Sequence, residues 1–238
     1  MNFSSVPFLF VLQCAFWIGL THTAHRRQQL TNGQAIAILV WLVMLTLWGF
    51  ATSALSIYGV YSSPAFLRLL PGLWLPLVPI ILSFSLYALS PTFRNAIHGI
   101  VTVTPARTFI FIQALRITAA GGLYKATHDL MPLVFTASVG IPDFLYGASA
   151  LVLVGITRYR RVNLQLLGVW HIVGIAIIVI TAPPVLQMSL PGPWYIFQNL
   201  PDGRALLEFP MVLAPTLVVP IFILTNAIAA CHLLRKSL

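Results

Sequence analysis

Long runs of apolar residues, separated by short polar segments, recur along the whole chain. The runs cover residues 6–21, 35–58, 70–89, 108–124, 131–156, 164–182 and 210–232. A helix needs about 20 apolar residues to cross the hydrocarbon core of a bilayer. The pattern therefore predicts an all-α fold, with residues 1–238 forming a single transmembrane domain: a polytopic membrane protein built as a bundle of about seven helices.

Composition supports a lipid surrounding. The 238 residues are 59% hydrophobic and 7% charged, with a mean hydropathy of +0.93. A soluble domain carries about 25% charged residues, so this chain has too few to cover a surface that faces water. We expect a lipid bilayer as its partner, in a bacterial inner membrane or a eukaryotic endomembrane. Topology accounts for the basic residues between the spans, so no nucleic-acid partner is expected.

The basic residues also predict the orientation of the chain. With seven spans, one side carries Arg26, Arg27, Arg94, Arg107, Arg158, Arg160, Arg161, Arg235 and Lys236, and the other carries Arg68, Lys125 and Arg204. The richer side faces the cytosol under the positive-inside rule. The N-terminus is then outside and the C-terminus cytosolic. No positive charge precedes the first run, unlike a signal peptide, so we expect this helix to be retained.

The segment 183–208 is the one long connection on the outer side. It is rich in proline and aromatic residues: Pro183, Pro184, Pro191, Pro193, Pro201, Trp194, Tyr195 and Phe197. Proline disrupts helices, and aromatic side chains favour the headgroup level of a membrane. This composition predicts an irregular interfacial flap over the bundle.

Three ionisable residues fall inside spans, where their cost marks them as functional candidates. They are Arg116, Asp143 and His171. Arg116 lies nine residues before the turn at 125–130 and Asp143 thirteen after it, so their depths differ by about 6 Å at 1.5 Å per residue. We predict that Arg116 and Asp143 form an ion pair. Such a pair either only locks the hairpin or marks a functional site, and both interpretations stay open.

The neighbours of this pair suggest a small polar site. Gln113 and Tyr146 lie about one turn from Arg116 and Asp143, and Trp170 precedes His171. With Trp194 of the flap, these residues are the expected substrate contacts. Pro142 predicts a break in the fifth span that leaves Asp143 near a new helix N-terminus, although a simple kink is the plainer alternative.

Two further acidic residues lie on the outer side. Asp129 follows the turn of the central hairpin and Glu208 precedes the last span. We include both, with Asp143, Arg116 and His171, as candidate catalytic residues. The plainer interpretations are a hydrogen-bonded core histidine for His171 and a favourable charge at a helix start for Glu208.

The sequence predicts no metal and no cofactor. Cys14 and Cys231 lie in apolar runs far apart, without a CxxC or Cys/His cluster. His171 is the one histidine deep inside a span, whereas a bis-histidine haem needs two. The last span has no lysine in its interior for a retinal Schiff base.

Seven spans, the short chain and an isolated membrane acid are features of two known groups. The Gly-x-x-Asp at Gly140–Asp143 resembles that of small bacterial seven-helix proteins without assigned function. In size and architecture the chain also resembles the small integral-membrane terpene cyclases of fungal meroterpenoid pathways. That resemblance implies acid-initiated cyclisation of an isoprenoid substrate taken from the membrane, although those cyclases use a pair of acidic residues and only one is placed here.

The implied chemistry has one internal conflict. A protonated carboxyl group in an apolar site can donate to an epoxide or carbonyl oxygen, and aromatic faces can stabilise a carbocation. An ion-paired Asp143 is a poor proton donor, so either the pair opens or Asp129 or Glu208 donates. We expect a membrane-embedded enzyme with a hydrophobic small-molecule substrate. The alternatives are a small-solute transporter or channel, and a non-catalytic subunit.

Overall fold

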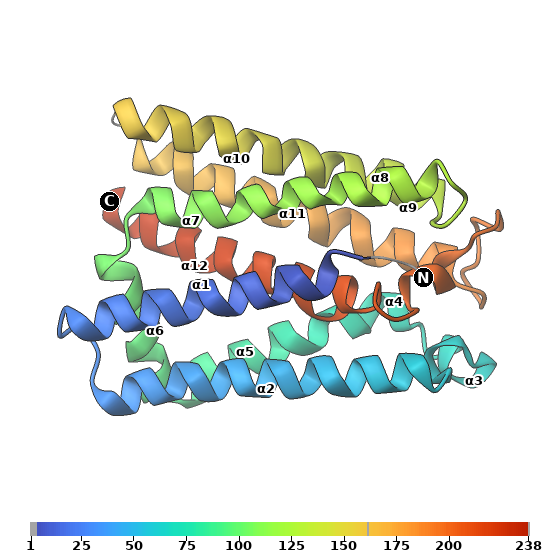
Figure 1. Cartoon of the computed structure of the whole chain (residues 1–238), viewed down its shortest axis with the longest axis horizontal. Coiled ribbons are helices and arrows are strands. Elements are labelled where there is room, and N and C mark those ends of the chain that lie inside the picture. The colour runs from blue at the N-terminus through green and yellow to red at the C-terminus, as the bar shows by residue number, and fades with distance from the viewer. Residues whose placement is uncertain (1–3, 161, 238) are drawn as a thin grey trace.

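The computed structural model describes residues 4–160 and 162–237, which form an elongated bundle of roughly parallel and antiparallel helices (Figure 1). Its long helices are α1 (Val6–Arg26), α2 (Asn32–Ile57), α5 (Val78–Leu89), α6 (Pro91–Val103), α10 (Ile141–Tyr159), α11 (Leu164–Ser189) and α12 (Val219–Ser237). Another long segment is α7 (Ala106–Gln113), which continues through the 3-10 turn η3 (Ala114–Ala119) into α8 (Ala120–Ala126).

Shorter elements connect these helices or continue them as parts of the same span. They are η1 (Val60–Ser62), α3 (Pro64–Leu67), α4 (Pro71–Trp74), η2 (Leu75–Leu77), α9 (Leu133–Phe135), η4 (Thr136–Gly140), η5 (Gly203–Leu206) and η6 (Ala214–Val218). Two of them, η4 and η6, are π-helical turns that lead directly into α10 and α12.

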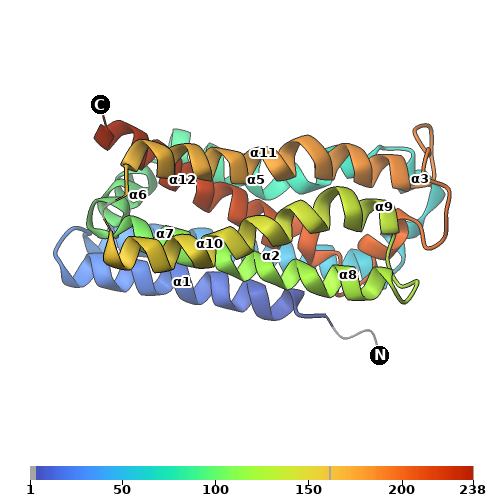
Figure 2. The ribbon, with the colours of Figure 1, turned by 90° about the horizontal axis from the view of Figure 1, so that it is seen from above.

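The membrane prediction is confirmed at the level of helices. Six helices are long and apolar enough to cross a membrane, and there are up to seven if Pro91–Val103 and Ala106–Ala126, which meet at 101°, form one span. The start of α1 and the end of α12 lie at opposite ends of the bundle (Figures 1 and 2), which agrees with seven passes. Many large apolar side chains face outward, such as Phe50 at 71% and Phe84 at 69% exposure, which suits a lipid-facing surface.

The helix α6 was not expected between the third and fourth predicted spans. Its apolar side chains Phe93, Ala96, Ile97 and Ile100 are buried against α1, α2 and α5. Phe93 completes a chain of aromatic contacts with Trp41 and Trp17, whose rings meet edge to face at 5.3 Å. This aromatic core packs α1, α2 and α6 together.

One prediction based on proline was wrong, and one of the two alternatives at Pro142 is excluded. Pro183 and Pro184 do not begin a flap, because α11 continues through both to Ser189 and the irregular segment starts at Leu190. The fifth span is not broken at Pro142 either, since Leu133–Tyr159 forms one helix in which the π turn η4 precedes the proline. A helix with packed neighbours can absorb the lost donor by widening one turn.

The connection that follows α11 is anchored onto the bundle. Asp202 accepts a hydrogen bond from the backbone N–H of Arg204 and forms a 2.8 Å ion pair with its guanidinium. The Asp202 hydrogen bond raises the pKa of Arg204. Leu190, Leu206 and Leu207 are buried, so the segment covers one end of the bundle.

Candidate functional site

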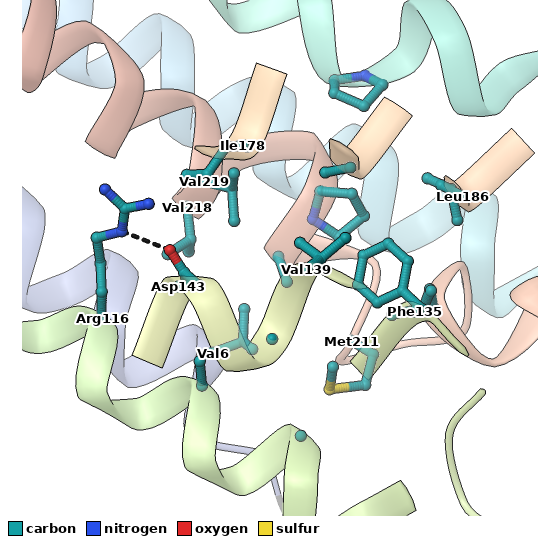
Figure 3. Close-up of a pocket in the computed structure, with 18 of the residues that line it drawn as sticks. Val6, Arg116, Phe135, Val139, Asp143, Ile178, Leu186, Met211, Val218 and Val219 are labelled. Atoms are coloured by element: carbon teal, nitrogen blue, oxygen red, sulfur yellow. Dashed lines mark hydrogen bonds and ion pairs between the residues drawn. The ribbon is translucent and has the colours of Figure 1, made fainter. Parts of the chain in front are cut away.

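The predicted ion pair is present at the point where α10 crosses η3. Arg116 comes from η3 and Asp143 from the first turn of α10. The Arg116 Nε atom donates to Asp143 Oδ1 at 2.5 Å (Figure 3). The Arg116 side chain has no exposed surface, whereas the Asp143 side chain is 16% exposed. The Arg116 cation is thus fully buried inside the bundle, whereas the Asp143 carboxylate is partly accessible.

Arg116 is held on two further sides. Its Nη1 and Nη2 atoms both donate to the carbonyl oxygen of Gly174 at 3.2 Å. The guanidinium also lies over the ring of Tyr146, 4.2 Å from the ring centre, in a cation–π arrangement. These contacts fix the orientation of Arg116 independently of Asp143.

Two glycines make this arrangement possible. A Cβ atom on Gly147 would lie 2.5 Å from the backbone nitrogen of Ile117, so α10 approaches η3 more closely than any other residue allows. A Cβ atom on Gly174 would collide with the ring of Tyr146. Nothing in the local sequence pattern distinguishes Gly174 from the other glycines of the spans.

Behind Arg116, polar side chains from three helices form a second layer. Tyr146 Oη donates to Asn226 Oδ1 at 3.3 Å, and His171 Nδ1 lies 2.6 Å from the same oxygen. Trp170 stacks on Tyr146 with ring centres 4.3 Å apart and donates to Ser149 Oγ. Asn226 was missed by sequence reasoning, although it is the one asparagine of the apolar helix α12.

A large apolar cavity begins at the ion pair. Its volume is about 540 Å³, within the range of about 300–1,000 Å³ for small-molecule sites. Asp143 and Arg116 lie at one end, and the walls carry apolar side chains such as Val139, Ile178 and Leu186 (Figure 3). At the other end the lining includes Ser4, Ser5, Tyr124, Lys125 and Leu130.

Both π-helical turns contribute to the wall of this cavity. Thr136, Val139 and Gly140 come from η4, and Ala214, Pro215 and Val218 come from η6. Each turn ends two residues before a proline, Pro142 or Pro220, whose ring clashes with the carbonyl four residues earlier. For Pro220 that carbonyl belongs to Thr216, and it accepts a hydrogen bond from Trp48 Nε1 at 2.9 Å. π-bulges are frequent at functional sites.

The candidate residues divide into three sets. Arg116 and Asp143 line the cavity. Gln113, Tyr146, Trp170 and His171 lie outside its lining, and Tyr146, Trp170 and His171 belong to the layer behind Arg116. Asp129, Glu208 and Trp194 are exposed and do not line the cavity. Within the described residues, Asp143 is therefore the one carboxylate that a ligand in this cavity meets.

Several cavity residues carried no sequence signal. Phe135, Phe222 and Met211 are ordinary apolar residues of apolar segments. Nothing in their local pattern distinguishes a cavity wall from a packed core. Among the residues that the structure describes, no three His, Cys, Asp or Glu side chains gather in a group that could hold a metal ion.

Residues 72–234 match the family described as Domain of unknown function (DUF8737), and the chain belongs to this family. The matched segment contains Arg116, Asp143 and Asn226, together with most of the cavity. No curated protein and no solved structure matches the chain.

Proposed function

We propose that this protein is a membrane-embedded enzyme that acts on a lipid-soluble, isoprenoid-type substrate in the cavity, with its reacting group at Asp143. The observation that carries the proposal is the cavity itself: an apolar space of about 540 Å³ with one ion pair at its inner end. A lipophilic molecule whose reacting group is polar matches an apolar cavity that ends at an ion pair.

The free side of Asp143 supplies the chemistry. Oδ1 is occupied by Arg116 Nε, while Oδ2 has no hydrogen-bond partner within residues 4–160 and 162–237. A proton carried on Oδ2 would be transferred to an epoxide oxygen of the substrate, and the C–O bond would break as an alkene electron pair forms a new C–C bond. Loss of a proton from the resulting carbocation to Asp143 restores the carboxyl group, so the product is an isomer of the substrate.

An Asp143 that is paired with Arg116 is a poor proton donor, and the fixed position of Arg116 offers a way for the pair to open. Because Gly174 and Tyr146 hold the guanidinium in place, Asp143 can turn towards the substrate without leaving Arg116 unsupported. Phe135 and Phe222 add aromatic faces to the wall, although aromatic side chains form a small part of it.

The cavity also favours an enzyme over an open channel. Its lining includes no residue of α2, α6 or α7. A second cavity of about 230 Å³ lies at the opposite end, around Thr102 and His232, and shares no lining residue with the first. An open channel would need one space that reaches both ends.

An isomerisation assay tests the proposal. Purified protein in zwitterionic nanodiscs is incubated with terminally epoxidised farnesol, and products of unchanged mass are separated by gas chromatography and mass spectrometry. We expect cyclic isomers from the wild type, none from Asp143→Asn, and wild-type yield from Asp202→Asn, which alters the ion pair outside the cavity. Equal yields from the wild type and Asp143→Asn would reject the proposed role of Asp143.

A further inference from the structure

The end of the cavity far from Asp143 contains an unpaired cation. Lys125, in the last turn of α8, is half-buried and lines the cavity. Of the residues described, only Arg116 and Arg204 form ion pairs with a carboxylate. The acid next in sequence, Asp129, lies on an exposed turn with a left-handed backbone (φ 52°) and does not pair with Lys125.

The cavity therefore has charged groups at both ends and apolar walls between them. Lys125 lies nine residues after Arg116 along one continuous helical segment, which corresponds to a rise of about 13 Å. A cation in the lining of an apolar cavity is unfavourable without an anionic partner. A ligand anion at this position would remove that cost.

We propose that the substrate of this cavity is an anionic amphiphile, whose phosphate or carboxylate head pairs with Lys125 and whose hydrocarbon chain extends inward so that its far end meets Asp143. This inference rests on the proposed function and specifies its substrate class. It also specifies the orientation of the substrate: the reaction takes place at the end of the hydrocarbon chain that is distant from the head.

The position of Lys125 in the fold agrees with such a head. Tyr124, Ser4 and Ser5 also line the cavity and add hydroxyl groups to its lining. Lys125 precedes the α8–α9 turn, which lies at the end of the bundle where α1 begins (Figure 2). A head placed here would sit near the bilayer surface, while its chain occupies the apolar space.

Binding of ligands that share one chain and differ in the head tests the inference. Farnesyl monophosphate, farnesoic acid and farnesol are each titrated into protein held in zwitterionic nanodiscs, and binding is measured by native mass spectrometry. Inorganic phosphate is the control ligand that lacks a hydrocarbon chain. We expect both anionic compounds to bind the wild type about tenfold more tightly than farnesol, as a charge-assisted contact allows, and inorganic phosphate to show no binding.

Variants separate Lys125 from a general effect of charge. Lys125→Gln should remove the preference for an anionic head and leave farnesol affinity unchanged, while Lys125→Arg should keep the preference. Arg68→Gln is the matched control, because Arg68 is an exposed cation that does not line the cavity; it should change nothing. A lysine that only extends its ammonium to the membrane surface would give equal affinities for all three farnesyl compounds, and that result overturns the inference.

Failure of the inference can be told apart from failure of the proposed function. If the farnesyl compounds bind equally well and Asp143→Asn still abolishes isomerisation, the proposed role of Lys125 is wrong but the proposed enzymatic function is supported. If none of the three compounds binds, the cavity does not take isoprenoid-type molecules and both are wrong.

Discussion

The crossing of α10 and η3 can be tested at one glycine. In Gly147→Ala the new Cβ would lie 2.5 Å from Ile117 N and 2.8 Å from Arg116 C. Ordinary contacts begin near 3.4 Å, and both neighbours are backbone atoms that no rotamer change can move. The helices must separate by about 1 Å, and overpacking of this kind costs about 1–3 kcal/mol.

The same helix provides the control. Gly155 also lies on α10, but a Cβ there meets nothing within 4 Å. Gly155→Ala should be neutral or stabilise the helix by up to about 1 kcal/mol, because alanine has the higher helix propensity. Unfolding titrations with sodium dodecyl sulfate in mixed micelles measure both free energies of unfolding.

Separation of the helices should also affect the site. Since Gly147 lies against the backbone of both Arg116 and Ile117, Gly147→Ala should displace Arg116 and lower the isomerisation yield, while Gly155→Ala should not. Equal stability and equal yield in the two alanine variants would refute the proposed helix crossing and the position of Arg116 that depends on it.

Three further predictions concern other contacts. Arg116→Met or Asp143→Leu alone should destabilise the protein by about 3–5 kcal/mol, as removal of one partner of a buried pair does, whereas the double variant should recover most of that loss in the same titration; additive losses would contradict a direct pair. Trp48→Phe removes the donor to the carbonyl of Thr216 and should cost about 1–3 kcal/mol, while Trp74→Phe, whose donor bond to Leu69 is exposed, should cost less; the reverse order would count against the role of Trp48 at the π turn. Burial raises the pKa of Tyr61, and its hydrogen bond to Thr52 has a smaller, opposite effect. The contribution of Tyr61 to stability is therefore complete below the ordinary tyrosine pKa of about 10 and is lost as pH rises through the higher pKa of the folded state. The difference in melting temperature between wild type and Tyr61→Phe should shrink above about pH 10, and a constant difference would exclude this effect.

The sequence was most informative where the cost of burial is greatest. Apolar runs of membrane length predicted the spans, because a lipid-facing helix leaves little choice of composition. The contact between Arg116 and Asp143 followed from hairpin geometry and from the cost of isolated charges in lipid. These two residues turned out to lie where the cavity begins.

Other features were beyond reach of a single sequence. The helices continue through Pro142, Pro183 and Pro184, although proline usually disrupts a helix, because packed neighbours compensate for a lost hydrogen bond inside a bundle. The cavity could not be predicted either, because its walls consist of the same apolar residue types as the core. Asn226 and Gly174 act through tertiary contacts that no local pattern encodes.

The most direct test of the account is to determine where a lipophilic ligand binds. A farnesyl monophosphate analogue with a diazirine near the chain end is photolysed with the protein in nanodiscs, and the labelled residues are identified by peptide mass spectrometry. The account predicts adducts confined to cavity residues near Asp143, such as Val139, Ile178 and Val219. Adducts spread instead over exposed lipid-facing residues such as Phe50 and Phe84, with the cavity unlabelled, would contradict it.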